Sequence, residues 1–156
     1  QSKKYHHDLI GCNSRLDSIQ AAILDVKLKY LDDYSKARQH AASVYNDLLS
    51  GVAGVITPKV FARSTHVYHQ YTIKLDSKEK RDGLKEYLQN KQIPSMIYYP
   101  VPLHKQKAYI KNDQETYPVT EKLSETVLSL PIHTEITREE QEFIVEKIKE
   151  YLTIRL

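Results

Sequence analysis

The sequence has little cysteine, little net positive charge and no long apolar run, and each of these shortages excludes a class of protein. The single cysteine, Cys12, rules out a disulfide within the chain and favours a reducing, cytoplasmic compartment. No apolar run approaches the ~20 residues that a membrane-spanning helix needs, and we expect no signal peptide. Lys plus Arg exceeds Asp plus Glu by three, 23 against 20, which is too few and too evenly spread for a nucleic-acid surface.

What is present is the composition of an ordinary soluble domain. The chain has 156 residues, of which 40% are hydrophobic and 28% charged, enough to bury one core. It contains no internal repeat and no low-complexity segment. It begins with Gln1 rather than methionine, which suits either a processed protein or a fragment of a longer one.

The longest predicted element is a helix from Asp17 to about Leu49. Asp17 stands at the N-cap position, and no Gly or Pro interrupts the run before Gly51. At 1.5 Å per residue the helix would be roughly 50 Å long, a length typical of a helix that bridges domains or lines a subunit interface. Its apolar stripe repeats at steps of three or four, as follows: Ile19, Ile23, Val26, Tyr30, Tyr34, Ala37, Ala41, Val44 and Leu48.

Two strands and a helix are predicted after a loop marked by Gly51 and Gly54. Residues 66–75 alternate as a strand does, and Asp76-Ser77 offers a cap for a helix that ends near Asn90. A second strand is predicted at residues 93–99, where Pro100 stops it. The residues expected on one face of the first strand are Val67, His69, Tyr71, Ile73 and Leu75.

The last third of the chain alternates irregular and regular segments. Residues 103–117 carry no clear pattern. A short helix that starts at Pro118 or Thr120 and a brief strand at residues 128–132 follow, and a capping box beginning at Thr137 opens the final helix. The predicted fold class is a two-layer α+β domain, with a short mixed or antiparallel sheet and helices packed on one face.

Residues 11–22 place phosphate-binding side chains before a helix. A turn at Gly11 sets Asn13 and Arg15 just ahead of the helix N-terminus, where free N–H groups and the helix dipole favour anions. Asn supplies an amide donor, and Arg supplies a planar cation that suits phosphate or carboxylate. The alternative is an ordinary helix start, with Asn13 in a turn and Arg15 on the surface.

Residues 97–104 end a strand in a loop fixed by two prolines. Tyr98, Tyr99 and His104 could direct two phenols and an imidazole toward a ligand, or the two tyrosines could simply lie at a domain edge. His66 and His69 do not predict a metal site, because strand positions three apart point to opposite faces.

Together these segments resemble a known family. The run GCNSRLDSIQAAIL at residues 11–24 is similar to the G-x-N-x-R-x-D-x-x-Q-A-A signature of the DegT/DnrJ/EryC1/StrS sugar aminotransferases. Residues 66–73, 98–109 and 118–133 match further family segments in the same order.

The resemblance implies the C-terminal part of a fold-type-I enzyme dependent on pyridoxal 5'-phosphate. Such enzymes are homodimers with composite sites, and they move an amino group, usually from glutamate, to a keto carbon of a nucleotide-linked sugar. We accordingly expect an interface and active-site loop at residues 1–16, a long linking helix at 17–50 and a small α/β domain at 51–156. Neither a nucleic acid nor a membrane is an expected partner.

The same resemblance assigns roles to individual residues. Asn13 matches the asparagine that binds the cofactor phosphate in the neighbouring subunit's site, and Arg15 matches the arginine close to that site or to the substrate. Tyr98 and Tyr99 match a dipeptide near the sugar, although many relatives have His at the first position. His104 fits the same motif.

Tyr5 lies in the loop before the signature, which in relatives can approach the partner's substrate. The family's Schiff-base lysine lies some tens of residues before the signature, whereas ten residues precede Gly11 here. We therefore assign no catalytic residue to this chain and expect it to be inactive alone. The competing hypotheses are a non-catalytic sugar-binding or protein-interaction module of the same fold and, disfavoured by the histidine geometry, a metal hydrolase.

Overall fold

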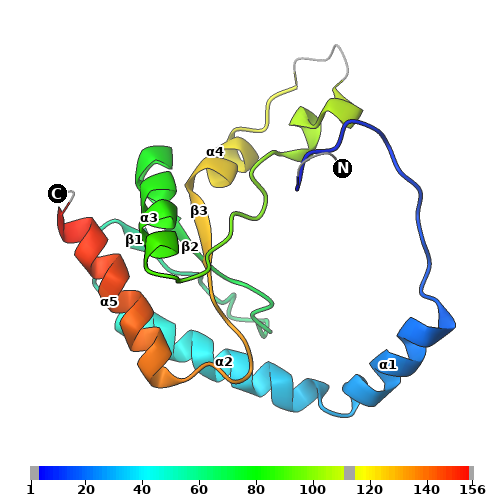
Figure 1. Cartoon of the computed structure of the whole chain (residues 1–156), viewed down its shortest axis with the longest axis horizontal. Coiled ribbons are helices and arrows are strands. Elements are labelled where there is room, and N and C mark those ends of the chain that lie inside the picture. The colour runs from blue at the N-terminus through cyan, green and yellow to red at the C-terminus, as the bar shows by residue number, and fades with distance from the viewer. Residues whose placement is uncertain (1–3, 111–114, 155–156) are drawn as a thin grey trace.

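A computed structural model describes residues 4–110 and 115–154 of the chain. Figure 1 shows a packed α/β body with an extended arm and a helix reaching away from it. The elements are, in chain order, α1 (Ser18–Leu28), α2 (Leu31–Leu48), β1 (Val55–Ile56), β2 (Tyr71–Leu75), α3 (Lys78–Asn90), the 3-10 turns η1 (Leu103–Lys105) and η2 (Lys107–Tyr109), α4 (Pro118–Thr126), β3 (Val127–Leu130) and α5 (Arg138–Ile154).

The sheet is antiparallel, in the order β1-β2-β3. Strand β2 is its centre, and Tyr71 lies opposite Leu130 in the register with β3. The next pair, Thr72 and Ser129, is joined by a hydrogen bond of 2.8 Å between the two hydroxyl oxygens. This pairing confirms the predicted short sheet and resolves it as antiparallel.

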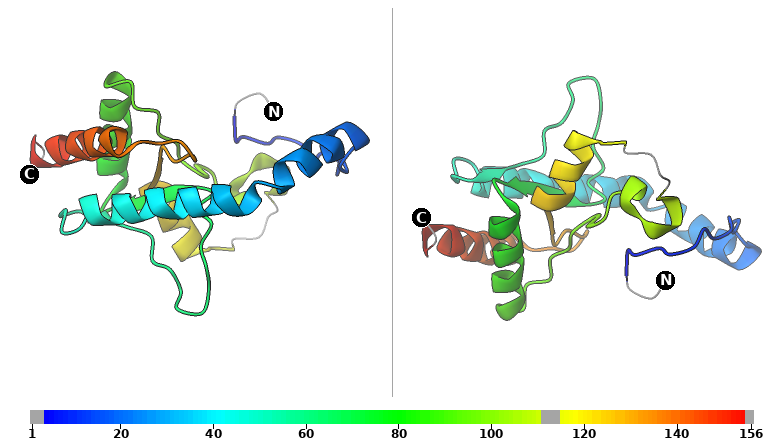
Figure 2. Two further views of the ribbon diagram at one scale, coloured as in Figure 1. Left: turned by 90° about the horizontal axis from the view of Figure 1, so that it is seen from below. Right: turned by 90° about the horizontal axis from the view of Figure 1, so that it is seen from above.

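One face of β2 is the centre of the hydrophobic core. Tyr71, Ile73 and Leu75 are buried, while the residues between them are partly exposed. The ring of Tyr45 from α2 stacks on Tyr71 with ring centroids 4.8 Å apart, and α3 and α5 contribute further buried side chains to the same cluster. Burial raises the pKa of both phenols far above the usual value. Figure 2 shows α2 and α5 running along the body.

The predicted single helix is two helices. Asp17 does cap the first, accepting from the Gln20 amide at 2.8 Å in a capping box, but α1 ends at Leu28. The Tyr30 amide donates to the Lys27 carbonyl at 3.0 Å, a tighter turn than an α-helix allows. Acidic side chains in the first turn of α2 then favour a new N-terminus. The prediction of one helix over residues 17–50 was wrong, because this break needs neither Gly nor Pro.

Two predicted strands are shorter or missing. Residues 66–70 lie outside β2, because Tyr68 has φ +46° and Arg38 Nη1 donates to the Tyr68 carbonyl at 3.2 Å, which removes that carbonyl from sheet pairing. The second predicted strand is reduced to a single bridge between Met96 and Ser129. Pro94 has no N–H to donate, so the ladder cannot extend.

The remaining predicted elements are confirmed. Ser77 caps α3 through a hydrogen bond from the Lys80 amide, and α4 opens at Pro118. Thr137 accepts from the Glu140 amide while the Glu140 carboxylate accepts from Thr137, which is the expected capping box. No helix of the described residues is long and apolar enough to cross a membrane.

Residues 4–17, here called the N-terminal arm, and α1 differ from the rest of the fold. Every residue from His7 to Tyr34 is exposed, and α1 buries none of its side chains. The apolar face of α1 therefore has no cover from the described part of the chain. Figure 1 shows the arm running from α1 back to the two 3-10 turns.

Candidate functional site

Three tyrosines gather where the N-terminal arm meets the loop after Met96. Tyr5, Tyr98 and Tyr99, here called the tyrosine cluster, have ring centroids 5.4–5.8 Å apart and interplanar angles of 73–79°. Edge-to-face contacts of this kind stabilise aromatic groups beyond simple burial. A side-chain hydrogen bond with Tyr5 raises the pKa of Tyr98. Tyr98 therefore offers a neutral phenol as a hydrogen-bond partner, and Tyr99 is 62% exposed.

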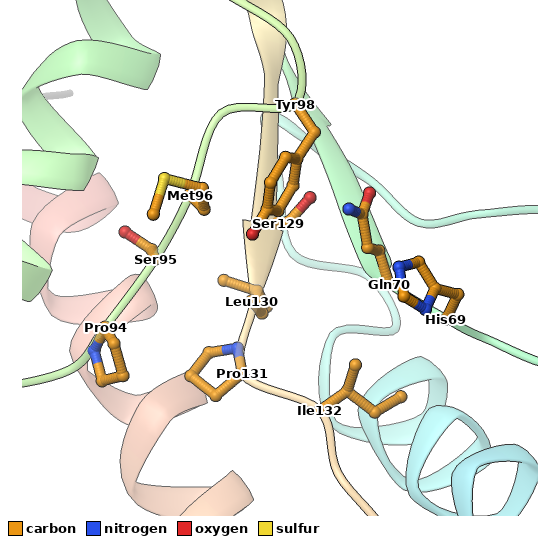
Figure 3. Close-up of a pocket in the computed structure, with 10 residues that line it drawn as sticks. All are labelled: His69, Gln70, Pro94, Ser95, Met96, Tyr98, Ser129, Leu130, Pro131 and Ile132. Carbon is orange, nitrogen blue, oxygen red and sulfur yellow. The ribbon is translucent and has the colours of Figure 1, made fainter. Parts of the chain in front are cut away.

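Tyr98 lines two cavities. The smaller, of about 270 Å³, also involves Ser95 and Ser129, and Figure 3 shows Tyr98 between the Pro94–Met96 segment and His69 with Gln70. The larger, of about 500 Å³, is bounded by Tyr98, Tyr99 and mainly apolar side chains of α4 and the loop. Apolar walls with a few polar groups are typical of small-molecule sites.

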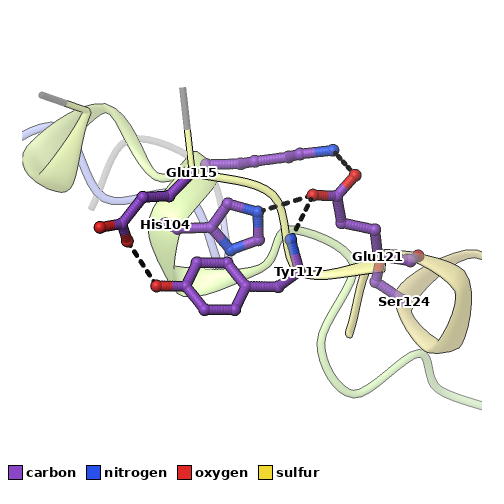
Figure 4. A network of polar contacts seen from close by, with 6 residues as sticks. His104, Glu115, Tyr117, Glu121 and Ser124 are labelled. Atoms are coloured by element: carbon purple, nitrogen blue, oxygen red, sulfur yellow. Dashed lines mark hydrogen bonds and ion pairs between the residues drawn. The ribbon is translucent and has the colours of Figure 1, made fainter. Parts of the chain in front are cut away.

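The larger cavity is bounded by a loop that one carboxylate fixes. The Glu121 carboxylate in α4 accepts from Lys105 Nζ at 2.6 Å and from the Tyr117 amide at 3.1 Å. His104 Nε2 lies 3.1 Å from the same carboxylate, as Figure 4 shows. The Lys105 contact first, then the Tyr117 amide and His104, lower the pKa of Glu121 to about 2. Glu121 thus stays ionised at every ordinary pH.

His104 therefore lies in a structural network, apart from the tyrosine cluster. Its ring packs against Tyr117 with centroids 4.8 Å apart. Our sequence reasoning did not single out Glu121. The available signal was the adjacent pair His104-Lys105 followed by an acid in the first turn of a predicted helix.

Asn13 and Arg15 lie on the N-terminal arm, away from both cavities. Both are exposed, and Cys12 beside them is exposed too. Within the described residues neither side chain has a hydrogen bond. The helix that follows is less of an anion site than its position predicts, because the Asp17 carboxylate already takes the Gln20 N–H. Any phosphate binding here depends on the Asn13 amide and the Arg15 guanidinium.

These two side chains fit only part of a site for pyridoxal 5'-phosphate. An amide and a guanidinium are suitable donors to a phosphate, but they lie on an exposed segment that lines neither cavity around Tyr98. A complete cradle would need donors from outside the described residues. The role expected of Asn13 and Arg15 at the cofactor phosphate stays a prediction.

The histidines form no metal site among the described residues. There, no group of three or more His, Cys, Asp or Glu side chains is arranged to hold a metal ion. His66 Nδ1 instead accepts from the Tyr68 amide at 2.9 Å, so its ring has a local structural role.

The fold matches part of solved aminotransferase structures. The structure superposes with a TM-score of 0.80 on S. venezuelae DesV in complex with a ketimine intermediate, at 32% identity, over 97% of this chain and 40% of that one. The model of the DegT/DnrJ/EryC1/StrS aminotransferase family matches residues 1–149. The chain belongs to this family, whose members depend on pyridoxal 5'-phosphate.

Two curated relatives illustrate the range of the family. A UDP-N-acetyl-3-dehydro-alpha-D-glucosamine 3-aminotransferase of Acidithiobacillus ferrooxidans is 44% identical, over 88% of this chain and 36% of that protein. A pleiotropic regulatory protein of Geobacillus stearothermophilus is 42% identical, over 95% of this chain and 40% of that protein. The chain thus spans about 40% of the length of the curated relatives it matches.

Proposed function

We propose that this chain is the C-terminal portion of a nucleotide-sugar aminotransferase that transfers an amino group, from glutamate, to a keto sugar. The observation that carries the proposal is the family match over residues 1–149 of a chain that spans about 40% of its relatives. The relative with 44% identity is named as an aminotransferase that acts on a UDP-linked keto sugar. The tyrosine cluster beside an apolar cavity supports a role in holding the sugar.

In this proposal the cofactor, when bound, supplies the electron sink for transamination. The chain's own residues bind and orient. Asn13 and Arg15 donate to the cofactor phosphate in the neighbouring subunit's site, while Tyr98, Tyr99 and Tyr5 contact the sugar. His104 orients the loop through Glu121 and is the further proposed contact to the substrate.

A homodimer in the cytoplasm completes the proposal. α1 leaves Ile19 75% exposed and Ile23 54% exposed, and an apolar helix face of this kind supports an interface with another chain segment. A composite site needs that interface, because Asn13 and Arg15 lie far along the arm.

The test compares this chain with the full-length aminotransferase that contains it. The full-length protein should transfer the amino group of glutamate to a nucleotide-linked 3-keto sugar. Mass spectrometry of the sugar product measures this transfer. The 156-residue chain alone should give no product and no stoichiometric cofactor–lysine adduct after borohydride reduction. Such an adduct at one lysine of the isolated chain would contradict the proposal that the catalytic lysine lies outside this chain.

The second candidate is a non-catalytic sugar-binding or protein-interaction module of the same fold. One observation favours keeping it: the relative with 42% identity is named as a regulatory protein. Sugar binding without amino transfer by the full-length protein, measured by calorimetry and by the same assay, would select this candidate.

A further inference from the structure

Gln106 is a buried polar side chain between two exposed lysines. It is only 6% exposed, and its amide uses its acceptor and both donors. Oε1 accepts from the His7 amide at 2.9 Å, and Nε2 donates to the Tyr5 carbonyl at 2.8 Å and the Val101 carbonyl at 3.3 Å. One side chain thus joins the N-terminal arm to the loop that carries Tyr98 and Tyr99.

Neighbouring contacts agree with this junction but do not replace it. The Ala108 amide donates to the His7 carbonyl at 3.0 Å, and Lys107 Nζ lies 3.3 Å from the Asp8 carboxylate. The ion pair is exposed, and exposed pairs stabilise little. A buried amide with three partners specifies geometry more strictly, because losing it leaves the groups it bonded unsatisfied.

The junction matters because most of the arm is exposed in the part of the chain that the structure describes. From His7 to Tyr34 every residue is exposed. The contact at Tyr5–His7 therefore fixes two things at once. It places the Tyr5 ring against Tyr98 and Tyr99, and it sets the start of the segment that leads to Asn13 and Arg15.

We propose that Gln106 is a positioning residue that holds the tyrosine cluster together and orients the arm. Gln106 lines neither of the cavities around Tyr98, so it acts through Tyr5 and the arm rather than by touching substrate. Its effect on sugar turnover rests on the proposed function, whereas its effect on the arm does not.

The first test measures hydrogen exchange in the 156-residue chain. Gln106→Met keeps the volume and removes all three hydrogen bonds. The matched control is Gln141→Met, since Gln141 is also buried, 1% exposed, and donates to the Ala41 carbonyl far from the cluster. Gln106→Met should lower protection of the His7 and Ala108 amides about tenfold or more, with β2 unchanged. Gln141→Met should leave both amides as they are.

The second test is a rescue. In Gln106→Glu, a protonated carboxyl still offers one donor and one acceptor, whereas an ionised one faces two carbonyl oxygens. Protection of His7, corrected for intrinsic exchange, should therefore return as pH falls from 7 to 4. Glu121 stays ionised throughout, since its pKa is about 2. The other titratable or charged groups beside the junction are His6, His7, Asp8 and Lys107. Their contribution to the pH dependence of His7 protection is measured on Gln106→Met over the same pH range.

The third test uses the full-length aminotransferase. Gln106→Met should lower kcat/KM for the keto sugar about tenfold to a hundredfold, because small misplacements are costly, and Gln141→Met should not. Unchanged His7 protection, or changed protection with unchanged turnover, would overturn the positioning role. Absence of turnover in the wild type would instead refute the proposed function, and the exchange and rescue results would still decide whether Gln106 orients the arm.

Discussion

The compact body and the N-terminal arm with α1 differ in whether their apolar side chains are buried. From α2 onward the chain buries a continuous apolar cluster that includes Tyr45, Ile73 and Ile148. Over residues 7–34 it buries nothing, although α1 alone carries Ile19, Ile23 and three further large aliphatic residues. The same kind of helical stripe thus serves as a core in one region and as an uncovered face in the other. Apolar periodicity predicts where a helix forms, while its cover depends on which chain segments are available.

The largest expected contrast between the two regions is in hydrogen exchange. In a dilute monomer, residues 8–20 should exchange with little protection, because few of their amides are bonded and none is buried. Strand β2 and residues 144–152 should exchange only on global unfolding, at a cost of about 5–15 kcal/mol. Uniform strong protection from Tyr5 onward in a proven monomer would contradict the contrast. Residues 5–7 are the one exception expected, through Gln106.

Truncation of one isoleucine in each region should separate them by stability. Ile148→Ala removes a fully buried side chain and should cost about 2–5 kcal/mol in the free energy of unfolding. Ile23→Ala, at a position 54% exposed, should cost less than about 0.5 kcal/mol. Urea titration of the 156-residue chain measures both. Similar costs would mean that α1 packs against the body in solution.

Asn13 tests whether the arm contributes to binding rather than to stability. In the full-length aminotransferase, Asn13→Ala should remove a hydrogen bond to a charged phosphate, worth about 1.5–3 kcal/mol or about ten- to a hundredfold in cofactor affinity. Ser14→Ala, one residue further along the same exposed segment, is the control. The melting temperature without cofactor should not change in either. An unaltered cofactor dissociation constant would show that Asn13 is only a turn residue.

The smallest expected effect is a pH dependence within the body. The pKa of Glu121 is lowered to about 2 from the ordinary 4.5, so its contribution is complete above about pH 4.5 and is lost as pH falls toward 2. The Tyr117 amide, which donates to Glu121, should shift in the NMR spectrum over that window. In Glu121→Gln the shift should be absent. A midpoint near 4.5 in the wild type would show that Lys105 and His104 do not hold the carboxylate.

Local patterns predicted most of the elements, and failures came where partners far along the chain decide. The caps at Asp17, Ser77 and Thr137 and the buried face of β2 follow from neighbouring residues alone. The start of β2 at Tyr71 depends instead on Arg38, which donates to the carbonyls of Tyr68 and His69 about thirty residues later in the chain. The helix break near Tyr30 could not be predicted, because no Gly or Pro marks it in the sequence.

The candidate site divides in the same way. The roles of Tyr98, Tyr99 and Tyr5 stay predictions, and the structure shows that Tyr5 packs against the other two rings across more than ninety residues. Gln106 was not predictable, because a glutamine in an irregular segment is ordinarily solvated, whereas here it bonds the arm at Tyr5 and His7. The roles of Asn13 and Arg15 remain predictions, since no contact among the described residues tests them.

The break after Leu28 gives α1 the mechanics of a lever. With 11 residues at 1.5 Å each, α1 is about 16 Å long, so a rotation of about 10° at Lys29 and Tyr30 would displace its far end by about 3 Å. That displacement is comparable to the whole length of a hydrogen bond. If Asn13 has the proposed phosphate-binding role, a rod pivoted at one end alone could not aim its side chain at a phosphate oxygen. The arm and α1 together are therefore held in place only when both ends of that segment are fixed, by α2 at one and by the tyrosine-bearing loop at the other.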